Sequence, residues 1–74
     1  MGLRVSYKKL WKLMIDKNMN KGELRLMTGI GTNTLAKLGK DQLVSMEVLL
    51  KICENLNCDI SNICEFVDNG ENNK

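Results

Sequence analysis

The chain contains no histidine and no proline among its 74 residues, and it has one tryptophan, one tyrosine and one phenylalanine. Without histidine, a cysteine or serine lacks its usual base for nucleophilic catalysis, and the common zinc-ligand sets lack a member. No apolar run approaches the ~20 residues that a membrane-spanning helix needs. We therefore expect no enzyme activity, no metal or cofactor, no small-molecule substrate and no membrane segment.

Cysteine is also scarce, and its number is odd. Cys53, Cys58 and Cys64 form no CxxC pair, which argues against a metal cluster and a disulfide framework. Cys53 and Cys64 fall on predicted inward helix faces, where cysteine behaves as a small core residue. Cys58 falls in a turn, and a redox role for its thiol stays open. This usage predicts a reduced protein of the cytoplasm.

Charge is divided unevenly along the chain. The formal net charge is +2, but residues 1–40 hold nine Lys or Arg and two Asp or Glu, a net charge of +7. Residues 41–74 hold two Lys and seven Asp or Glu, a net charge of −5. A polyanion would be attracted to the first half and repelled by the second. Ordinary solvated helix faces would give the same counts, so the asymmetry matters only beside a binding motif.

The positive half contains a stretch with the signals of two short helices, residues 20–40, NKGELRLMTGIGTNTLAKLGK. Asn20 and Glu23 have the spacing of a capping box that starts the first helix. Leu24 and Met27 follow at helical spacing, which predicts that both lie on one buried face.

Glycines separate this helix from the next one. Gly29 and Gly31 interrupt the pattern, because glycine reaches a positive φ without steric cost and commonly ends a helix. A second helix, at about 31–38, then places Leu35 and Leu38 inward. Two short helices joined by a tight turn, with polar residues leading the second, form the plan of a DNA-reading helix-turn-helix.

The remaining chain predicts three more helices, at about 7–17, 46–55 and 60–65. Their predicted N-caps are Ser6, Ser45 and Asp59. The first helix is expected to bury an apolar stripe consisting of Tyr7, Leu10, Trp11, Met14 and Ile15.

The two ends of the chain are β-prone and can pair as a short ribbon, since Leu3 and Val5 alternate near the start and Phe66-Val67 follow the last helix. The polar tail 68–74 is expected to be disordered. The domain is therefore placed at residues 1–67.

The run TGIGTNTL at residues 28–35 and the apolar spacing that follows it carry a family resemblance. Over roughly residues 7–67 the chain resembles the lambda-repressor/Cro-like (XRE-type) helix-turn-helix proteins, in particular a small stand-alone bacterial and phage branch. The resemblance implies an all-α domain of five helices, with the second and third forming the helix-turn-helix and room for a two-stranded terminal ribbon. Lys21 departs from the frequent Gln, and Gly31 from the usual Ser or Thr cap. The positions further along that share the spacing are Val44, Ser45, Leu49, Ile52, Leu56, Ile60 and Ile63.

The resemblance implies a small transcriptional regulator that binds specific double-stranded DNA and places the second helix of the motif in the major groove. The alternative is a protein-interaction module that keeps the fold without binding DNA. A homodimer is left open as a further partner. The candidate base-contacting residues are Thr32, Asn33, Thr34 and Lys37, and the candidate phosphate-contacting residues are Lys21, Gly22, Arg25, Lys40 and Gln42.

Overall fold

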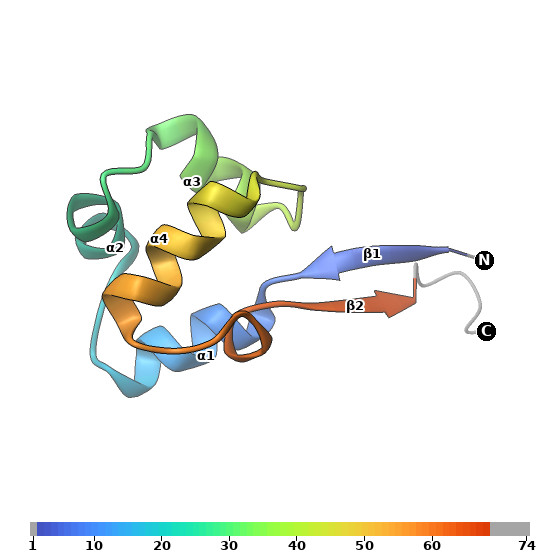
Figure 1. Ribbon diagram of the computed structural model, residues 1–74, viewed down its shortest axis with the longest axis horizontal. Coiled ribbons are helices and arrows are strands. Elements are labelled where there is room, and N and C mark those ends of the chain that lie inside the picture. Colours follow the sequence, from blue (N-terminus) through green and yellow to red (C-terminus); the bar gives the residue numbers. More distant parts are fainter. Residues whose placement is uncertain (1, 69–74) are drawn as a thin grey trace.

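The computed structural model describes residues 2–68. Figure 1 shows helices gathered at one end of the molecule and a two-stranded ribbon that projects from them. The described residues form β1 (Leu3–Ser6), α1 (Lys8–Asp16), α2 (Lys21–Thr28), α3 (Thr32–Gly39), α4 (Met46–Leu56), the 3-10 turn η1 (Ile60–Asn62) and β2 (Glu65–Asp68).

Side-chain caps start two of the helices where the sequence predicted them. The capping box of α2 is confirmed: the Asn20 side chain accepts the Glu23 N–H at 2.8 Å, and the Glu23 carboxylate accepts the Asn20 N–H at 2.9 Å. The Ser45 hydroxyl caps α4 by accepting the Val48 N–H at 3.2 Å. These bonds satisfy donors that have no partner within the helix.

The prediction of a fifth helix at about residues 60–65 is wrong. The chain makes a single 3-10 turn at Ile60–Asn62. The Asn62 side chain accepts the Asp59 N–H at 2.9 Å, and the Asp59 carboxylate accepts the Ser61 N–H at 3.5 Å. Glu65 already belongs to β2, where it lies opposite Ser6. The strand takes the residues that a longer helix would need, so the described part of the chain, residues 2–68, contains four α-helices.

The predicted terminal ribbon is confirmed. β1 and β2 pair antiparallel, with Val5 opposite Phe66 and Arg4 opposite Val67. Val5 is buried against the helices, whereas Phe66 is exposed. The fold is thus mostly helical with a small sheet rather than wholly α-helical.

The core fills the space between the four helices and the base of the ribbon. The sequence correctly placed Leu10, Met14 and Leu24 inside, but Ile15 and Met27 are exposed by 74% and 47%. Both lie one residue away from the true buried stripes, which continue through Met14 in α1 and through Thr28 in α2. The buried apolar residues are Val5, Tyr7, Leu10, Met14, Leu24, Ile30, Leu38, Leu49, Ile52, Leu56 and Ile63.

The predicted tail lies almost wholly outside the described residues, which end at Asp68 in β2. Within residues 2–68, no helix is long and apolar enough to cross a membrane.

Candidate nucleic-acid interface

Buried and left-handed residues fix the angle between α2 and α3. Gly29 ends α2 at φ 74°, in the left-handed region that favours glycine. The Thr28 hydroxyl donates to the Leu24 carbonyl at 2.7 Å and accepts the Ile30 N–H at 3.5 Å. Ile30 is buried in the core directly after the turn. The turn is therefore held by side chains on both sides, which gives α3 a fixed direction.

α3 presents a polar face to solvent. Leu38 is fully buried and anchors the helix, while Thr32, Asn33 and Lys37 are exposed. Thr34, the fourth predicted base-contacting residue, is half-buried. Asn33 and Lys37 lie four residues apart and therefore project from the same side of the helix.

Ala36 belongs to this exposed face, and the sequence analysis did not single it out. Ala36 is exposed and lies one turn after Thr32, so the two residues project from the same side of α3. The four-residue spacing that relates Asn33 to Lys37 also relates Thr32 to Ala36, but a small apolar side chain does not by its type indicate a base contact. A methyl group at this position suits contact with the methyl group of thymine.

Lys21 is held in place at the start of α2. Its Nζ lies 4.6 Å from the centroid of the Trp11 ring, in the geometry of a cation–π contact. A Cβ built on Gly39 would lie 3.9 Å from the same Nζ, so the ammonium also sits beside the end of α3. Trp11 is half-buried and packs against the core, as predicted, and its exposed part supports this lysine.

Gly22 has a role that the sequence did not reveal. A Cβ at this position would lie 3.3 Å from the Asn20 Oδ1 atom, which is the acceptor of the α2 cap. The absence of a side chain leaves room for the capping box. Among the other predicted phosphate-contacting residues, Lys40 and Gln42 are exposed and Arg25 is half-buried.

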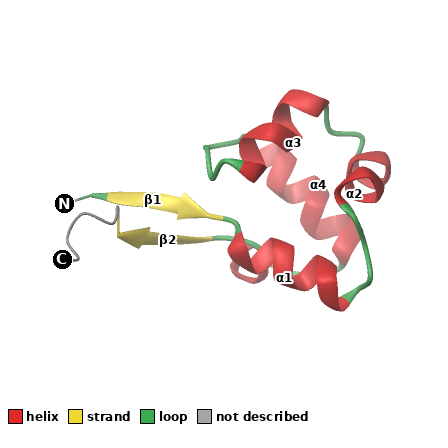
Figure 2. Ribbon diagram, turned by 180° about the vertical axis from the view of Figure 1, so that it is seen from behind, coloured by secondary structure: helices red, strands yellow, loops and turns green. Residues whose placement is uncertain are grey.

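Asp41 joins the end of α3 to the start of α1, and the sequence analysis missed it. Its Oδ1 accepts the Tyr7 N–H at 3.0 Å, and its Oδ2 lies 3.2 Å from the Arg4 Nη1. The Tyr7 hydroxyl donates to the Gln42 carbonyl at 2.8 Å. Figure 2 shows the loop after α3 approaching β1 and the start of α1. The predicted Ser6 cap is weak, at 3.4 Å from the Lys8 N–H, so Asp41 supplies the closer acceptor at this helix start.

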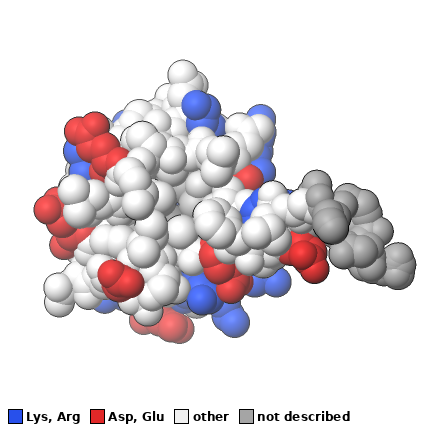
Figure 3. All heavy atoms as spheres, turned by 45° about the vertical axis from the view of Figure 1, so that its right-hand side comes forward, with Lys and Arg blue, Asp and Glu red and all other residues white. Residues whose placement is uncertain are grey.

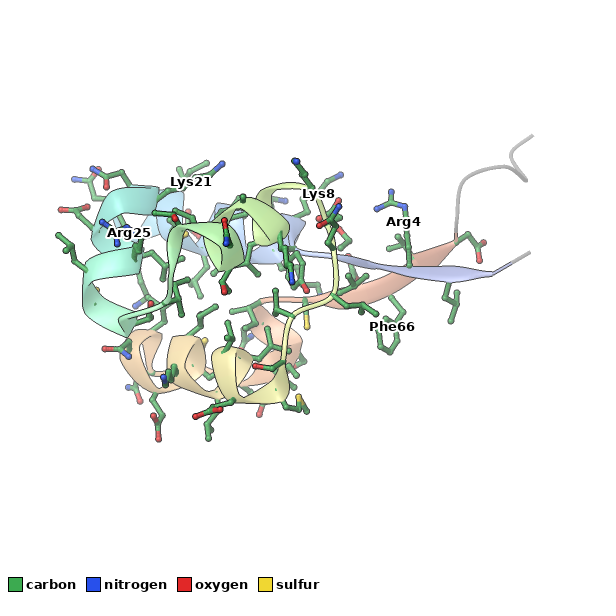
Figure 4. The ribbon with its side chains drawn as sticks, turned by 90° about the horizontal axis from the view of Figure 1, so that it is seen from above. Arg4, Lys8, Lys21, Arg25 and Phe66 are labelled. Carbon is green, nitrogen blue, oxygen red and sulfur yellow. The ribbon has the colours of Figure 1, made fainter. Side chains whose placement is uncertain are left out.

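Positive side chains extend from the helix-turn-helix toward the ribbon. In Figure 4, Arg4, Lys8 and Lys21 point to the same side of the molecule, and Arg25 lies further along α2. Within residues 2–68 the ion pairs are Arg4–Asp41 at 3.2 Å and Lys9–Glu65 at 3.6 Å. Acidic residues of the second half therefore balance part of the positive charge of the first half. Arg4 pairs with Asp41 and lies on the same side of the molecule as Lys8 and Lys21.

The three cysteines are free and half-buried. Burial, with Cys58 as its neighbour, raises the pKa of the Cys53 thiol to about 11. Burial also raises the pKa of Cys64. Both shifts disfavour the reactive thiolate. Among residues 2–68 no group of three or more His, Cys, Asp or Glu side chains is placed to hold a metal ion.

The sequence profile of the Cro/C1-type HTH DNA-binding domain matches residues 9–69 of this chain. This range includes α1 except for its first residue, the whole of α2, α3 and α4, and the turn between α2 and α3. The chain belongs to the Cro/C1-type helix-turn-helix family. This confirms the family and the DNA-binding, regulatory character that the residues of the motif predicted.

A solved member of similar structure is the transcriptional regulator VanUg, in its crystal form II. The two chains are 58% identical, with 90% of this chain and 89% of the other covered, and the TM-score is 0.88. No curated protein sequence matches this chain. As a Cro/C1-type protein it is a DNA-binding regulator.

Proposed function

We propose that this Cro/C1-type protein binds double-stranded DNA of specific sequence by placing α3 in the major groove, and that it regulates transcription in this way. The observation that carries the proposal is the exposed face of α3, with Thr32, Asn33, Ala36 and Lys37, on a helix anchored by the buried Leu38. The major groove admits one α-helix and presents donors, acceptors and methyl groups that differ between base pairs.

Each side chain of this face has a natural partner on the bases. The Asn33 amide can donate to and accept from an adenine at once, which distinguishes adenine from the other bases. Lys37 reaches a guanine or the backbone from one turn further on. The Ala36 methyl suits a thymine methyl, while Thr32 and the half-buried Thr34 contact the rim of the groove or a phosphate.

The helix starts suit the DNA backbone on either side. The first N–H groups of α3 have no side-chain cap, because Gly31 occupies the N-cap position. At the start of α2, Gly22 and Lys21 are both exposed residues. Free N–H groups and the positive end of the helix dipole favour a phosphate at such positions. Lys40, Gln42 and Arg25 are the further candidates on the rim.

Selection of bound duplexes from a random pool tests the proposal directly, because a specific reader enriches one short sequence. A salt titration on a random duplex tests the electrostatic part: each neutralised phosphate steepens the fall of log K with log salt by about 0.9. We expect enrichment of one sequence and a steep slope. A chain that binds no duplex even at low salt would contradict the proposal and favour the protein-interaction module.

A further inference from the structure

Three positive side chains lead from the helix-turn-helix to the ribbon. Arg4 belongs to β1, Lys8 is the first residue of α1, and Lys21 is the first residue of α2. Figure 4 shows all three pointing to the same side of the molecule, whereas α4 lies on the opposite side. In Figure 3, which shows much of the α4 side, Lys and Arg side chains lie mainly at the margin of a largely uncharged surface. The three residues, here called the basic row, therefore share a side that α4 does not reach.

One hollow connects the members of the basic row. This open hollow of about 470 Å³ is lined by Arg4, Lys8, Trp11 and Gly39, among others. The Nζ of Lys21 lies 4.6 Å from the centroid of the Trp11 ring and 3.9 Å from a Cβ built on Gly39. Because Trp11 and Gly39 belong to the hollow, Lys21 lies at its edge, and the three cations follow one another along a single surface.

Neighbouring carboxylates leave much of this positive charge available. Within residues 2–68, neither Lys8 nor Lys21 forms an ion pair, and the contact of Lys21 is with a neutral ring. Arg4 pairs with Asp41 through its Nη1, and the Arg4 side chain remains 47% exposed. A guanidinium has five N–H donors, so the bond to Asp41 gives it a direction and leaves other donors for an anion.

The acidic residues that line the hollow show where the basic row ends. Glu65 pairs with Lys9 at 3.6 Å, so its charge is balanced beside α1. Asp68 lies opposite Leu3, one residue beyond Arg4 toward the outer end of the ribbon. Arg4 is the last cation toward this end of the described ribbon. An anion is therefore attracted along the basic row and repelled beyond its ribbon end.

We propose that the basic row binds phosphates of the DNA strand that passes the start of α2, so that the contact continues beyond the helix-turn-helix onto α1 and the ribbon. The inference rests on the proposed function, which places a phosphate at Lys21. One strand carries a phosphate every ~3.4 Å of helix axis, so a strand bound at Lys21 presents further phosphates to Lys8 and Arg4. Such contacts fix the position of the protein on the duplex and add affinity without reading bases.

Salt titrations on a random duplex test the inference, because the slope of log K against log salt counts the phosphates that the protein neutralises. We expect Lys8→Gln and Arg4→Gln each to flatten this slope by about 0.9, and the double variant to flatten it by about 1.8. Between about 50 and 200 mM salt, each single variant should therefore lose about 3.5-fold less affinity than the wild-type chain.

The matched control is Lys51→Gln, which removes the same charge from an exposed residue of α4, on the opposite side of the molecule. Its slope should equal that of the wild-type chain. Arg4→Gln also removes the pair with Asp41, so thermal unfolding of each variant checks that the fold is kept. Arg4→Lys keeps the positive charge and should restore the wild-type slope, since the slope depends on the charge that meets the phosphate.

The inference is overturned if Lys8→Gln or Arg4→Gln keeps the wild-type slope, or if Lys51→Gln flattens the slope as much as they do. Failure of the proposed function gives a different result, because the wild-type chain would then bind no duplex even at low salt. A steep wild-type slope that Lys8→Gln and Arg4→Gln share would keep DNA binding and confine the phosphate contacts to the helix-turn-helix.

Discussion

Replacement of Asp41 tests how far the position of α3 depends on a contact outside the helix-turn-helix. The carboxylate acts as the cap of α1 through its bond to the Tyr7 N–H, and loss of a capping acceptor costs about 1 kcal/mol. The pair with Arg4 adds at most ~0.5–1 kcal/mol, because its side chains are 47% and 35% exposed. Asp41 also has φ 55°, where alanine costs roughly 1 kcal/mol.

These contributions predict that Asp41→Ala lowers the free energy of unfolding by about 2–3 kcal/mol. Asp41→Asn keeps an acceptor oxygen and tolerates the left-handed conformation, so it should lose only ~0.5–1 kcal/mol. In a domain of this size 1 kcal/mol corresponds to roughly 4–8 °C of melting temperature. We therefore expect Tm to fall by about 10–20 °C for Ala and by less than ~8 °C for Asn.

Thermal and denaturant unfolding followed by circular dichroism would measure both variants. Equal losses for Ala and Asn would show that the ion pair with Arg4, rather than the cap and the backbone conformation, carries the effect. A loss below ~0.5 kcal/mol for Ala would refute the reasoning altogether. Asp41→Asn should also keep its affinity for DNA, since its loop remains bonded to Tyr7.

Asn33→Ala should cost about 1–3 kcal/mol of binding to the selected duplex and relax the preference at one base pair, whereas an equal loss on random DNA would reject direct readout. Lys21→Ala should weaken binding to all duplexes alike and flatten the salt slope by about 0.9, as measured by fluorescence anisotropy. Gly29→Ala should lower the free energy of unfolding by about 1 kcal/mol in denaturant unfolding. Gly31→Ala should change this free energy by about zero, because Gly31 has a negative φ and its added Cβ would meet nothing within 4 Å. Cys53 should reach half of its maximal alkylation rate near pH 11, because burial raises the pKa of its thiol from 9.0 to about 11 in the folded protein. For the same reason, the stability that the protonated thiol contributes should be fully present below pH 9 and should be lost as the pH rises to about 11.

Local signals let the sequence predict most of the helix-turn-helix. The capping box of Asn20 and Glu23 involves residues three apart, and the left-handed Gly29 is a property of one residue. Such features depend little on the rest of the chain, so they can be predicted from the neighbouring residues alone. The same holds for the Ser45 cap of α4.

Contacts between distant residues account for what the sequence could not predict. Asp41 accepts the N–H of Tyr7, 34 residues earlier, and Lys21 lies over Trp11 of the preceding helix. The short η1 is set by β2, which requires β1 as its partner from the other end of the chain. Ile15 and Met27 were misplaced because helical spacing leaves the exact direction of a buried stripe uncertain by about one residue.

The contact between Lys21 and Trp11 has a consequence for DNA binding that charge alone does not give. An exposed cation–π contact is worth about 0.5–1 kcal/mol, less than the ~1.5–3 kcal/mol of a hydrogen bond to a charged group, so the ring does not outcompete a phosphate. An ammonium has three donors, and the ring covers only one side of it, so both contacts can exist together. Folding thereby restricts a side chain that otherwise carries about 2 kcal/mol of rotamer entropy. Binding then has less entropy to remove, and the affinity lost in Lys21→Ala includes this preorganisation as well as one positive charge.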